Sequence, residues 1–197
     1  MLENGFHDVP RGKLAMVVTH LEMRSPMPLR DVPTPAGITL RKVEPTLDWY
    51  RDIFDRVGSQ DWLWYGRLKK SDAELQAILS ADDTVFYTLT KNGHDEALLE
   101  LKFNEDQECE LAYFGLTPGL IGTGAGRYLM NYAIHTAWAK PISRLRLHTC
   151  TMDSPQAMAF YIRSGFTPYK RQIEIDDDPR LIGLLGNEAG PHVPIIA

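Results

Sequence analysis

The sequence has few cysteines, no long apolar run and no excess of basic residues, and each absence excludes a class of protein. Cys109 and Cys150 are the only cysteines in 197 residues, and neither has His or Cys at metal-ligand spacing. A disulfide framework or a zinc site is therefore not expected, and we predict no metal. No apolar run approaches the roughly 20 residues that a membrane-spanning helix requires, so no membrane partner is expected.

The charge balance argues against a nucleic-acid partner. The formal net charge is -5, whereas nucleic-acid binding depends on clustered Lys and Arg. A small or basic acceptor fits this charge better. The first residues mix charged side chains with isolated apolar ones and lack the apolar core of a secretory signal, so the cytoplasm is the expected location.

The length of 197 residues predicts one globular domain with short extensions. Residues 1–36 read as an N-terminal arm, with an extra strand expected at 14–23 and a proline-rich linker after it. Residues 37–175 contain the periodic segments that form the domain. Residues 176–197 form a C-terminal tail to which the sequence assigns no role.

The hydrophobic periodicity of the domain predicts a mixture of strands and helices. Ser71-Asp-Ala-Glu74 has the form of a capping box, so a helix is expected from there to about residue 80. Ser154-Pro155 suggests an N-cap and first helical residue, and Gly165 suits the end of that helix. Strands are expected at 38–43, 85–90, 97–103, 108–116, 145–150 and 166–175, with further helices at 45–57 and from the glycine loop to 139.

The glycine loop, residues 122–126, follows a predicted strand and opens a helix. Gly122, Gly124 and Gly126 have no side chains, so backbone N–H groups can approach an anion while the helix dipole adds positive potential. A dinucleotide fold needs different glycine spacing and a later acidic residue, and a nucleotide P-loop needs Gly-Lys-Ser or Gly-Lys-Thr. The remaining alternative is a tight strand-to-helix turn without a ligand.

The loop and a second motif together resemble the GNAT acetyltransferases. That family's phosphate loop has the form Arg/Gln-x-x-Gly-x-Gly/Ala, and here it reads Ile121-Gly-Thr-Gly124-Ala-Gly126. The family's later helix ends in Tyr-x-x-x-Gly-Phe, which matches Tyr161 to Phe166. The resemblance covers about 37–175 and is strongest in the second half. Two positions depart from the family pattern: Ile121 replaces Arg or Gln, and Ser154 replaces an Asn.

The resemblance implies an α+β fold, in which a central, mostly antiparallel sheet with a splayed strand pair carries flanking helices. It also implies acetyl-CoA as co-substrate, transfer of the acetyl group to a primary amine, and a bulge near the end of the 108–116 strand. The cofactor-binding residues implied are Phe114, Gly115, Leu116, Ile121, Gly122, Thr123, Gly124, Ala125, Gly126, Arg127 and Ser154.

Acetyl transfer needs a base for the amine and an acid for the departing thiolate. Glu110 resembles the family's strand glutamate and is the predicted base, directly or through water, with Glu100 on the neighbouring strand as its rival. Period-2 alternation predicts that Glu110 shares a face with Ala112, Phe114 and Leu116. Tyr161 resembles the tyrosine near the coenzyme sulfur and is the predicted acid.

An aromatic set between the first two helices is the candidate acceptor site. It consists of Trp62, Trp64 and Tyr65, with Arg67 beside it, and aromatic faces suit a cationic or flat acceptor. A small-molecule or peptide amine is the expected acceptor. Three alternatives stay open: an acetyltransferase acting on protein N-termini or lysines, a non-catalytic acyl-CoA-binding regulatory module, and a homodimer in which the N-terminal strand meets a second subunit.

Overall fold

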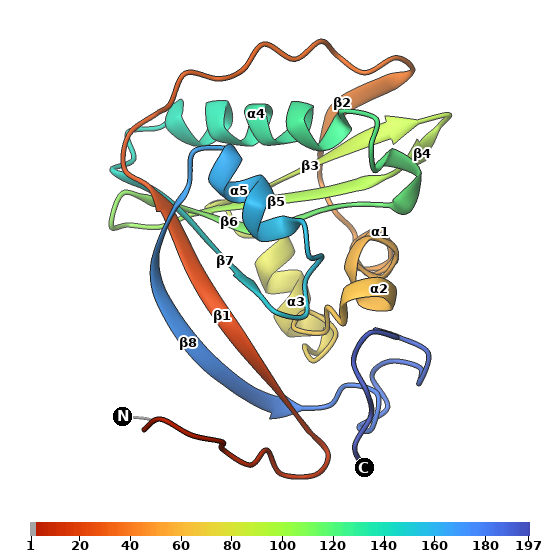
Figure 1. Cartoon of the computed structure of the whole chain (residues 1–197). Coiled ribbons are helices and arrows are strands. Elements are labelled where there is room, and N and C mark those ends of the chain that lie inside the picture. Colours follow the sequence, from red (N-terminus) through yellow and green to blue (C-terminus); the bar gives the residue numbers. More distant parts are fainter. Residues whose placement is uncertain (1–2) are drawn as a thin grey trace.

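The computed structural model describes residues 3–197 and shows a single mixed sheet flanked by helices (Figure 1). The predicted α+β fold is thereby confirmed. The strands are paired in the order β2-β3-β5-β6-β7-β1-β8, with β4 on β3, and all pairs are antiparallel except β6 with β7. Their bounds are β1 Lys13–Met23, β2 Ile38–Val43, β3 Thr84–Lys91, β4 His94–Asp95, β5 Ala97–Phe103, β6 Glu108–Leu116, β7 Arg144–Cys150 and β8 Thr167–Asp177.

The helices begin and end mostly where their capping residues predict. Ser71 caps α3 through both bonds of a capping box, and Gly124, with φ +86°, precedes α4. The bounds are α1 Leu47–Phe54, the π-helical turn η1 Asp55–Ser59, α2 Gln60–Trp62, α3 Asp72–Leu79, the 3-10 turn η2 Pro118–Leu120, α4 Ala125–Trp138 and α5 Ala157–Arg163. No helix among the described residues is long and apolar enough to cross a membrane.

Helix α5 begins later than the sequence predicts. Its N-cap is Gln156, not Ser154, because the Ala157 N–H donates to the Ser154 carbonyl oxygen at 2.9 Å in a tight turn. Ser154 and Pro155 therefore belong to the loop between β7 and α5. This leaves the Ser154 side chain at the surface of a cavity described below.

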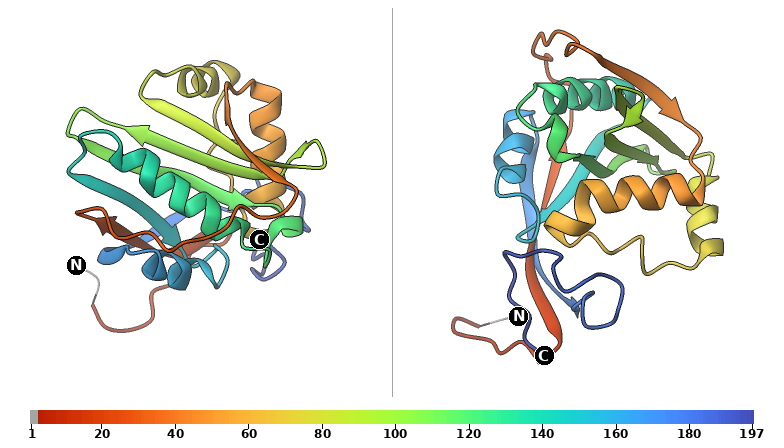
Figure 2. Two further views of the ribbon diagram at one scale, coloured as in Figure 1. Left: turned by 90° about the horizontal axis from the view of Figure 1, so that it is seen from above. Right: turned by 90° about the vertical axis from the view of Figure 1, so that its right-hand side faces the viewer.

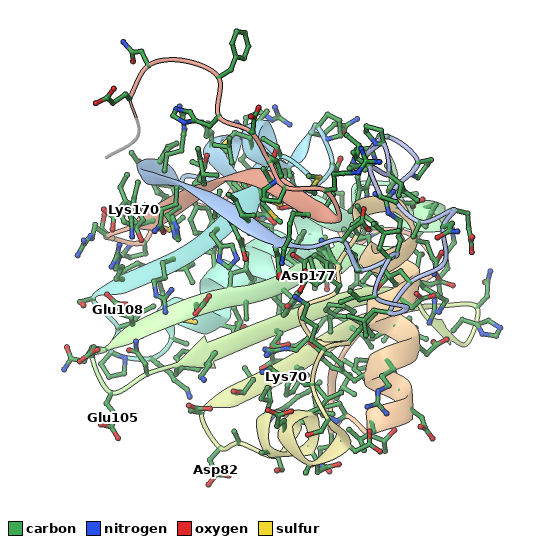
Figure 3. All side chains as sticks on the ribbon, turned by 90° about the horizontal axis from the view of Figure 1, so that it is seen from below. Lys70, Asp82, Glu105, Glu108, Lys170 and Asp177 are labelled. Atoms are coloured by element: carbon green, nitrogen blue, oxygen red, sulfur yellow. The ribbon has the colours of Figure 1, made fainter. Side chains whose placement is uncertain are left out.

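Each face of the sheet has its own core. On one face, α4 and α5 cover a core that includes Leu99, Leu129 and Leu147 (Figure 2). On the other face, α1 and α3 cover a second core, to which α1 contributes Tyr50 and Phe54. In a view of this second face, Asp82 and Glu105 point outward from turns at the rim (Figure 3).

Strands β6 and β7 separate after a short parallel contact. Their pairing ends at Glu110 opposite Arg146, although both strands continue, so a gap opens in the sheet beyond this pair. The predicted splay is therefore present. It gives access between the strands from either face.

The bulge in β6 lies at Ala112, earlier than predicted. Leu101 pairs with Leu111 and Glu100 with Tyr113, so Ala112 has no partner on β5. One extra residue reverses the faces of everything that follows. The prediction that Glu110 shares a face with Phe114 and Leu116 is therefore wrong: Phe114 and Leu116 contact the α4 core, whereas Glu110 lies on the opposite face.

The predicted extra strand, β1, lies inside the sheet. It pairs with β7 on one side and with β8 on the other. The segment after β1, residues 24–36, crosses over α4, where the Asn131 amide nitrogen donates to the Arg30 carbonyl oxygen at 2.7 Å (Figure 1). Part of the segment 1–36 is thus an internal strand of the sheet.

The C-terminal tail, residues 178–197, folds back beneath α2 and has a buried centre (Figure 1). The Arg180 side chain is 1% exposed and pairs with Asp178, itself 2% exposed, at 2.7 Å. The remaining guanidinium donors reach the carbonyl oxygens of Ala189, Gly190 and Val193. One arginine therefore organises most of the tail.

Candidate functional site

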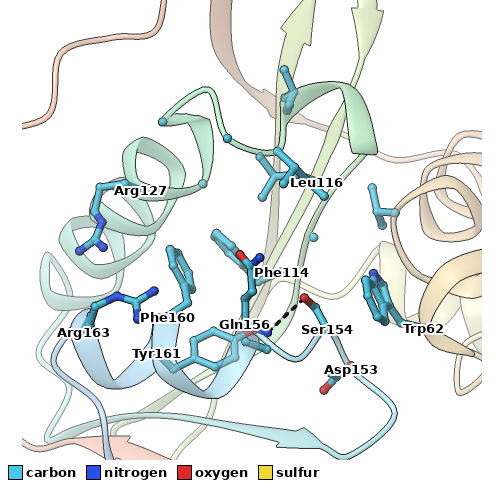
Figure 4. A pocket seen from close by; sticks show the side chains of 18 of the residues that line it. Trp62, Phe114, Leu116, Arg127, Asp153, Ser154, Gln156, Phe160, Tyr161 and Arg163 are labelled. Carbon is cyan, nitrogen blue, oxygen red and sulfur yellow. Dashed lines mark hydrogen bonds between the residues drawn. The ribbon is translucent and has the colours of Figure 1, made fainter. Parts of the chain in front are cut away.

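A cavity of about 300 Å³ lies where the end of β6, the glycine loop and α5 meet (Figure 4). We call it the coenzyme cleft, after the cofactor-binding residues that the resemblance implies. Its size is at the lower end of the range for small-molecule sites. Apart from Thr123 and Ala125, every residue that the resemblance implies for cofactor binding lines it. The lining residues used below are Phe114, Gly115, Leu116, Ile121, Gly122, Gly124, Gly126, Arg127, Asp153, Ser154, Gln156, Phe160, Tyr161 and Arg163.

The glycine loop has the backbone that an anion site needs. Gly122 and Gly124 both have positive φ, at +81° and +86°, which other residues rarely adopt. The Thr123 hydroxyl donates to the Leu120 carbonyl oxygen at 2.7 Å, which fixes the loop from within. The first N–H groups of α4 have no carbonyl partner within the helix and lie at the positive end of its dipole. The loop can therefore bind a phosphate group.

A second cavity, also about 300 Å³, lies on the other side of the splay. We call it the acceptor cavity, because Trp62, Trp64 and Tyr65, the predicted acceptor residues, line it. It shares Trp62, Trp64, Phe114, Asp153 and Tyr161 with the coenzyme cleft, so the two cavities meet at these side chains. Its other lining residues include Met16, Leu63, Tyr65, Gly66, Lys69, Ala112, Tyr113, His148, Cys150, Met152, Glu174 and Asp176. The two cavities therefore adjoin at the splay.

Tyr161 lies at the junction of the two cavities. Burial raises the pKa of its phenol far above the usual range, and the nearby Asp153 carboxylate raises it further. The phenol therefore stays protonated at neutral pH. It can donate a proton or a hydrogen bond to a group that gains negative charge beside it.

Asp153 also lies at the junction, and sequence reasoning missed it. Its carboxylate accepts hydrogen bonds from Trp64 Nε1 at 2.9 Å, Thr149 Oγ1 at 2.6 Å and the Cys150 N–H at 2.9 Å. These bonds fix the carboxylate and hold the Trp64 indole in the shared wall. The sequence signal for Asp153 was its position three residues after the end of a strand. Asp is common at such positions in ordinary turns, so the signal is weak.

Glu110 lines neither cavity. Its carboxylate pairs with Arg146 at 2.9 Å, and its other oxygen lies 3.9 Å from His148 Nδ1. His148 is half-exposed and lines the acceptor cavity. The route from the acceptor cavity to Glu110 therefore passes His148.

Glu100 is enclosed in the core and lines neither cavity. It is fully buried, accepts from Tyr50 Oη at 2.6 Å and forms an ion pair with Arg67. Burial raises the pKa of Glu100, whereas this carboxylate holds the pKa of Arg67 above its usual range. Arg67 also lies over the Tyr113 ring, at 5.1 Å. Glu100 and Arg67 therefore lie behind the cavity walls and line neither cavity.

The aromatic set lines the cavities, and close packing against glycines holds Trp64 there. Trp62 and Trp64 line both cavities, and Tyr65 lines the acceptor cavity. A Cβ atom at Gly58 would lie 2.0 Å from Trp64 Cδ2, and one at Gly115 would lie 3.0 Å from Trp64 Cη2. Gly58 is therefore required for the Trp64 position, whereas a side chain at Gly115 would need only a small shift of Trp64.

The comparisons with known proteins agree with this geometry. The model of the acetyltransferase (GNAT) family matches residues 43–166, which is more than half of the chain. The chain belongs to the GNAT acetyltransferase family. The matched range begins at the end of β2 and ends just after α5, so it includes both cavities' main walls. GNAT enzymes take the acetyl group from acetyl-CoA, and the coenzyme cleft fits that co-substrate.

Among curated proteins, a mycothiol acetyltransferase from Jonesia denitrificans is 26% identical over 188 residues, covering 91% of this chain and 58% of that protein. Among solved structures, a GCN5-related N-acetyltransferase from Sphaerobacter thermophilus has a TM-score of 0.59 at 13% identity, covering 83% of this chain and 52% of that one. A relative from Kribbella flavida has a TM-score of 0.55 at 19% identity, covering 87% and 63%. This GNAT chain thus spans under two thirds of each relative's length.

No cluster of three or more His, Cys, Asp or Glu side chains that could hold a metal ion is present in the described part, residues 3–197. The two cysteines are free. Burial raises the pKa of Cys109 to about 12 and that of Cys150 to about 11, so neither is a ready thiolate.

Proposed function

We propose that the chain is an acetyl-CoA-dependent N-acetyltransferase that transfers the acetyl group directly to a primary amine. The observation that carries this proposal is the junction of two cavities at Tyr161, with the glycine loop at the far end of one of them. A thioester whose phosphates lie at the loop would present its carbonyl carbon at this junction, facing an amine in the acceptor cavity.

Tyr161 acts as the acid in this proposal. The amine nitrogen attacks the thioester carbon, the C–S bond breaks, and the Tyr161 phenol protonates the thiolate that leaves. Its raised pKa keeps the phenol protonated before the reaction. Phe114 and Gly115 line the cleft beside it, and the free strand edge there can bind the thioester oxygen and the pantetheine chain.

Glu110 acts as the base in this proposal, reached through His148 or a water molecule. The amine must lose a proton. His148 lines the acceptor cavity, and the Glu110 carboxylate lies 3.9 Å from His148 Nδ1. Glu100 is a poorer base because its ion pair with Arg67 and its hydrogen bond from Tyr50 enclose it.

The charge of the acceptor cavity favours a cationic small molecule or peptide amine. Asp153, Glu174 and Asp176 line it, against Lys69, and Lys69 is itself bound to Asp176 at 2.5 Å. Tyr65 offers an aromatic face, over which the Lys69 ammonium already lies at 4.7 Å. An acceptor with a carboxylate next to its amine would meet repulsion here.

Thiol release tests the proposal. Purified protein with acetyl-CoA is mixed with a diamine, an aromatic amine, a lysine peptide, a free peptide N-terminus, and mycothiol lacking its acetyl group. Free thiol above both the control without amine and the control without acetyl-CoA, together with an acetylated product by mass spectrometry, is the expected result. Turnover of the peptides alone would favour a protein acetyltransferase. Binding of acetyl-CoA without turnover of any amine would favour a regulatory module and overturn the proposal.

A further inference from the structure

The coenzyme cleft carries an arginine cluster that the glycine loop does not explain. Arg127 lies in the first turn of α4 and Arg163 at the end of α5, and both line the cleft beside Phe160 (Figure 4). Arg30, in the N-terminal arm, is close enough to act on Arg127 electrostatically. Three elements far apart in the sequence thus bring three guanidinium groups to one place.

These arginines have no acidic partner. Among residues 3–197, none of Arg30, Arg127 and Arg163 forms an ion pair with a carboxylate. Burial lowers the pKa of Arg127, and Arg30 and Arg163 lower it further. Like charges held together repel, so the cluster favours a bound anion of high charge.

The position of the cluster is fixed by contacts of its own. The arm is held on α4 by the hydrogen bond from the Asn131 amide to the Arg30 carbonyl oxygen, 2.7 Å. The Arg127 guanidinium lies 5.7 Å from the centre of the Phe160 ring. Contacts therefore hold the arm at Arg30 and the Arg127 side chain in place.

Coenzyme A carries its phosphates in two places: a pyrophosphate and a separate 3′-phosphate on the ribose. Backbone N–H groups at the glycine loop suit the pyrophosphate, and the loop needs no cation for it. A terminal phosphate monoester carries a charge of about -1.5 to -2 and three acceptor oxygens, which match guanidinium donors. The cluster therefore fits the 3′-phosphate.

Resting on the proposed function, we propose that Arg30, Arg127 and Arg163 form a binding site for the 3′-phosphate of coenzyme A. The N-terminal arm is then part of the cofactor site. The chain selects acetyl-CoA over acetyl thioesters of 3′-dephospho-coenzyme A. Ile121, where the family has Arg or Gln, is offset by cations farther along the coenzyme.

Two coenzymes and matched variants test this site. Dissociation constants for acetyl-CoA and acetyl-3′-dephospho-CoA are measured calorimetrically on the full chain and on Arg30→Gln, Arg127→Gln, Arg163→Gln and Arg127→Lys. Arg171→Gln, an exposed arginine on β8, is the control. The unchanged chain should bind acetyl-CoA about 10- to 100-fold more tightly, since charge-assisted bonds have that strength. Added salt should reduce this preference.

Each Gln variant should weaken acetyl-CoA binding and leave the dephospho compound unchanged, so that the ratio falls toward one. Retained binding of the dephospho compound also shows that the variant is folded, and Arg127→Lys should keep part of the preference. Equal affinity of the unchanged chain for both compounds overturns the site, as does an equal loss for both in the variants, which would assign the arginines to the pyrophosphate. Failure to bind either compound overturns the proposed function itself.

Discussion

At the scale of single residues, Tyr161 has the environment of an acid. Burial and Asp153 both raise its pKa, so the phenol stays protonated well above pH 7. We expect Tyr161→Phe to lower kcat about 10²-fold or more while the acetyl-CoA dissociation constant changes little. The control is Tyr169→Phe, an exposed tyrosine on β8. An equal loss in cofactor affinity would point to a packing role.

The pH dependence of this step follows from the same shift. A phenol with a raised pKa loses its proton only at a pH above the usual value of about 10. The rate should therefore show no alkaline fall due to Tyr161 below that pH. This outcome is read from the profile of kcat that accompanies the Tyr161→Phe comparison.

Glu110 is the second residue whose role can be tested singly. Gln keeps its shape but cannot accept a proton, so we expect Glu110→Gln to lower kcat/KM about 10²- to 10⁴-fold. Glu105→Gln, in the exposed turn before β6, should leave kcat/KM unchanged. An unchanged kcat/KM in Glu110→Gln would remove Glu110 as the base.

At the scale of elements, η1 positions the acceptor wall through Gly58. A Cβ there would lie 2.0 Å from Trp64, so one of the two must move. We expect Gly58→Ala to lower the free energy of unfolding by about 1–3 kcal/mol, the range for overpacking, and to raise the KM for the amine. Gly119→Ala is the matched control, because no atom lies within 4 Å of its added Cβ. Urea unfolding and steady-state kinetics measure both effects.

The C-terminal tail depends on one buried ion pair. Arg180→Met leaves the Asp178 carboxylate buried without its cation, and the loss is expected to be about 3–5 kcal/mol. Hydrogen exchange should then increase in the tail before it increases in β5. The tail packs His192 against Trp62, with ring centres 5.5 Å apart and ring planes tilted by 58°, so the amine KM should rise too. Arg171→Met serves as the exposed control, and an unchanged tail would contradict the ion-pair account.

At the scale of the whole molecule, stability should fall in acid. A hydrogen bond from Arg180 lowers the pKa of Asp178. Burial by itself would raise the pKa of Asp95, but hydrogen bonds from Trp49 and Arg41 lower this pKa overall. Groups with a lowered pKa stabilise the fold above their unfolded value, near 4, and lose this contribution as the pH falls through the folded value.

The expected result is a urea midpoint that is steady between about pH 7 and 5 and falls progressively below about pH 4. In Asp178→Asn, the midpoint at pH 7 should be lower and its fall in acid shallower, because one titrating group is gone. A midpoint that rises in acid would show that Glu100, whose pKa burial raises, outweighs these aspartates.

Much of the molecule could be predicted from local chemistry. The capping box at Ser71, the glycine loop before α4 and the strand β5 each depend on residues near in sequence, and each prediction agrees with the structure. The family motifs lie within one stretch as well. Local hydrogen bonds and side-chain period are properties of short segments, so the sequence alone determined the elements, their order and the family.

Other features depend on residues brought together only by folding. The bulge at Ala112 reverses the face of Phe114, and a strict alternation cannot reveal one unpaired residue. Asp153 at the junction and Arg30 beside Arg127 lie on elements distant in sequence from their neighbours. The tertiary structure therefore decided which face Glu110 occupies, where the cavities meet and which cations share the coenzyme cleft, because registers and contacts between distant segments arise only when the sheet assembles.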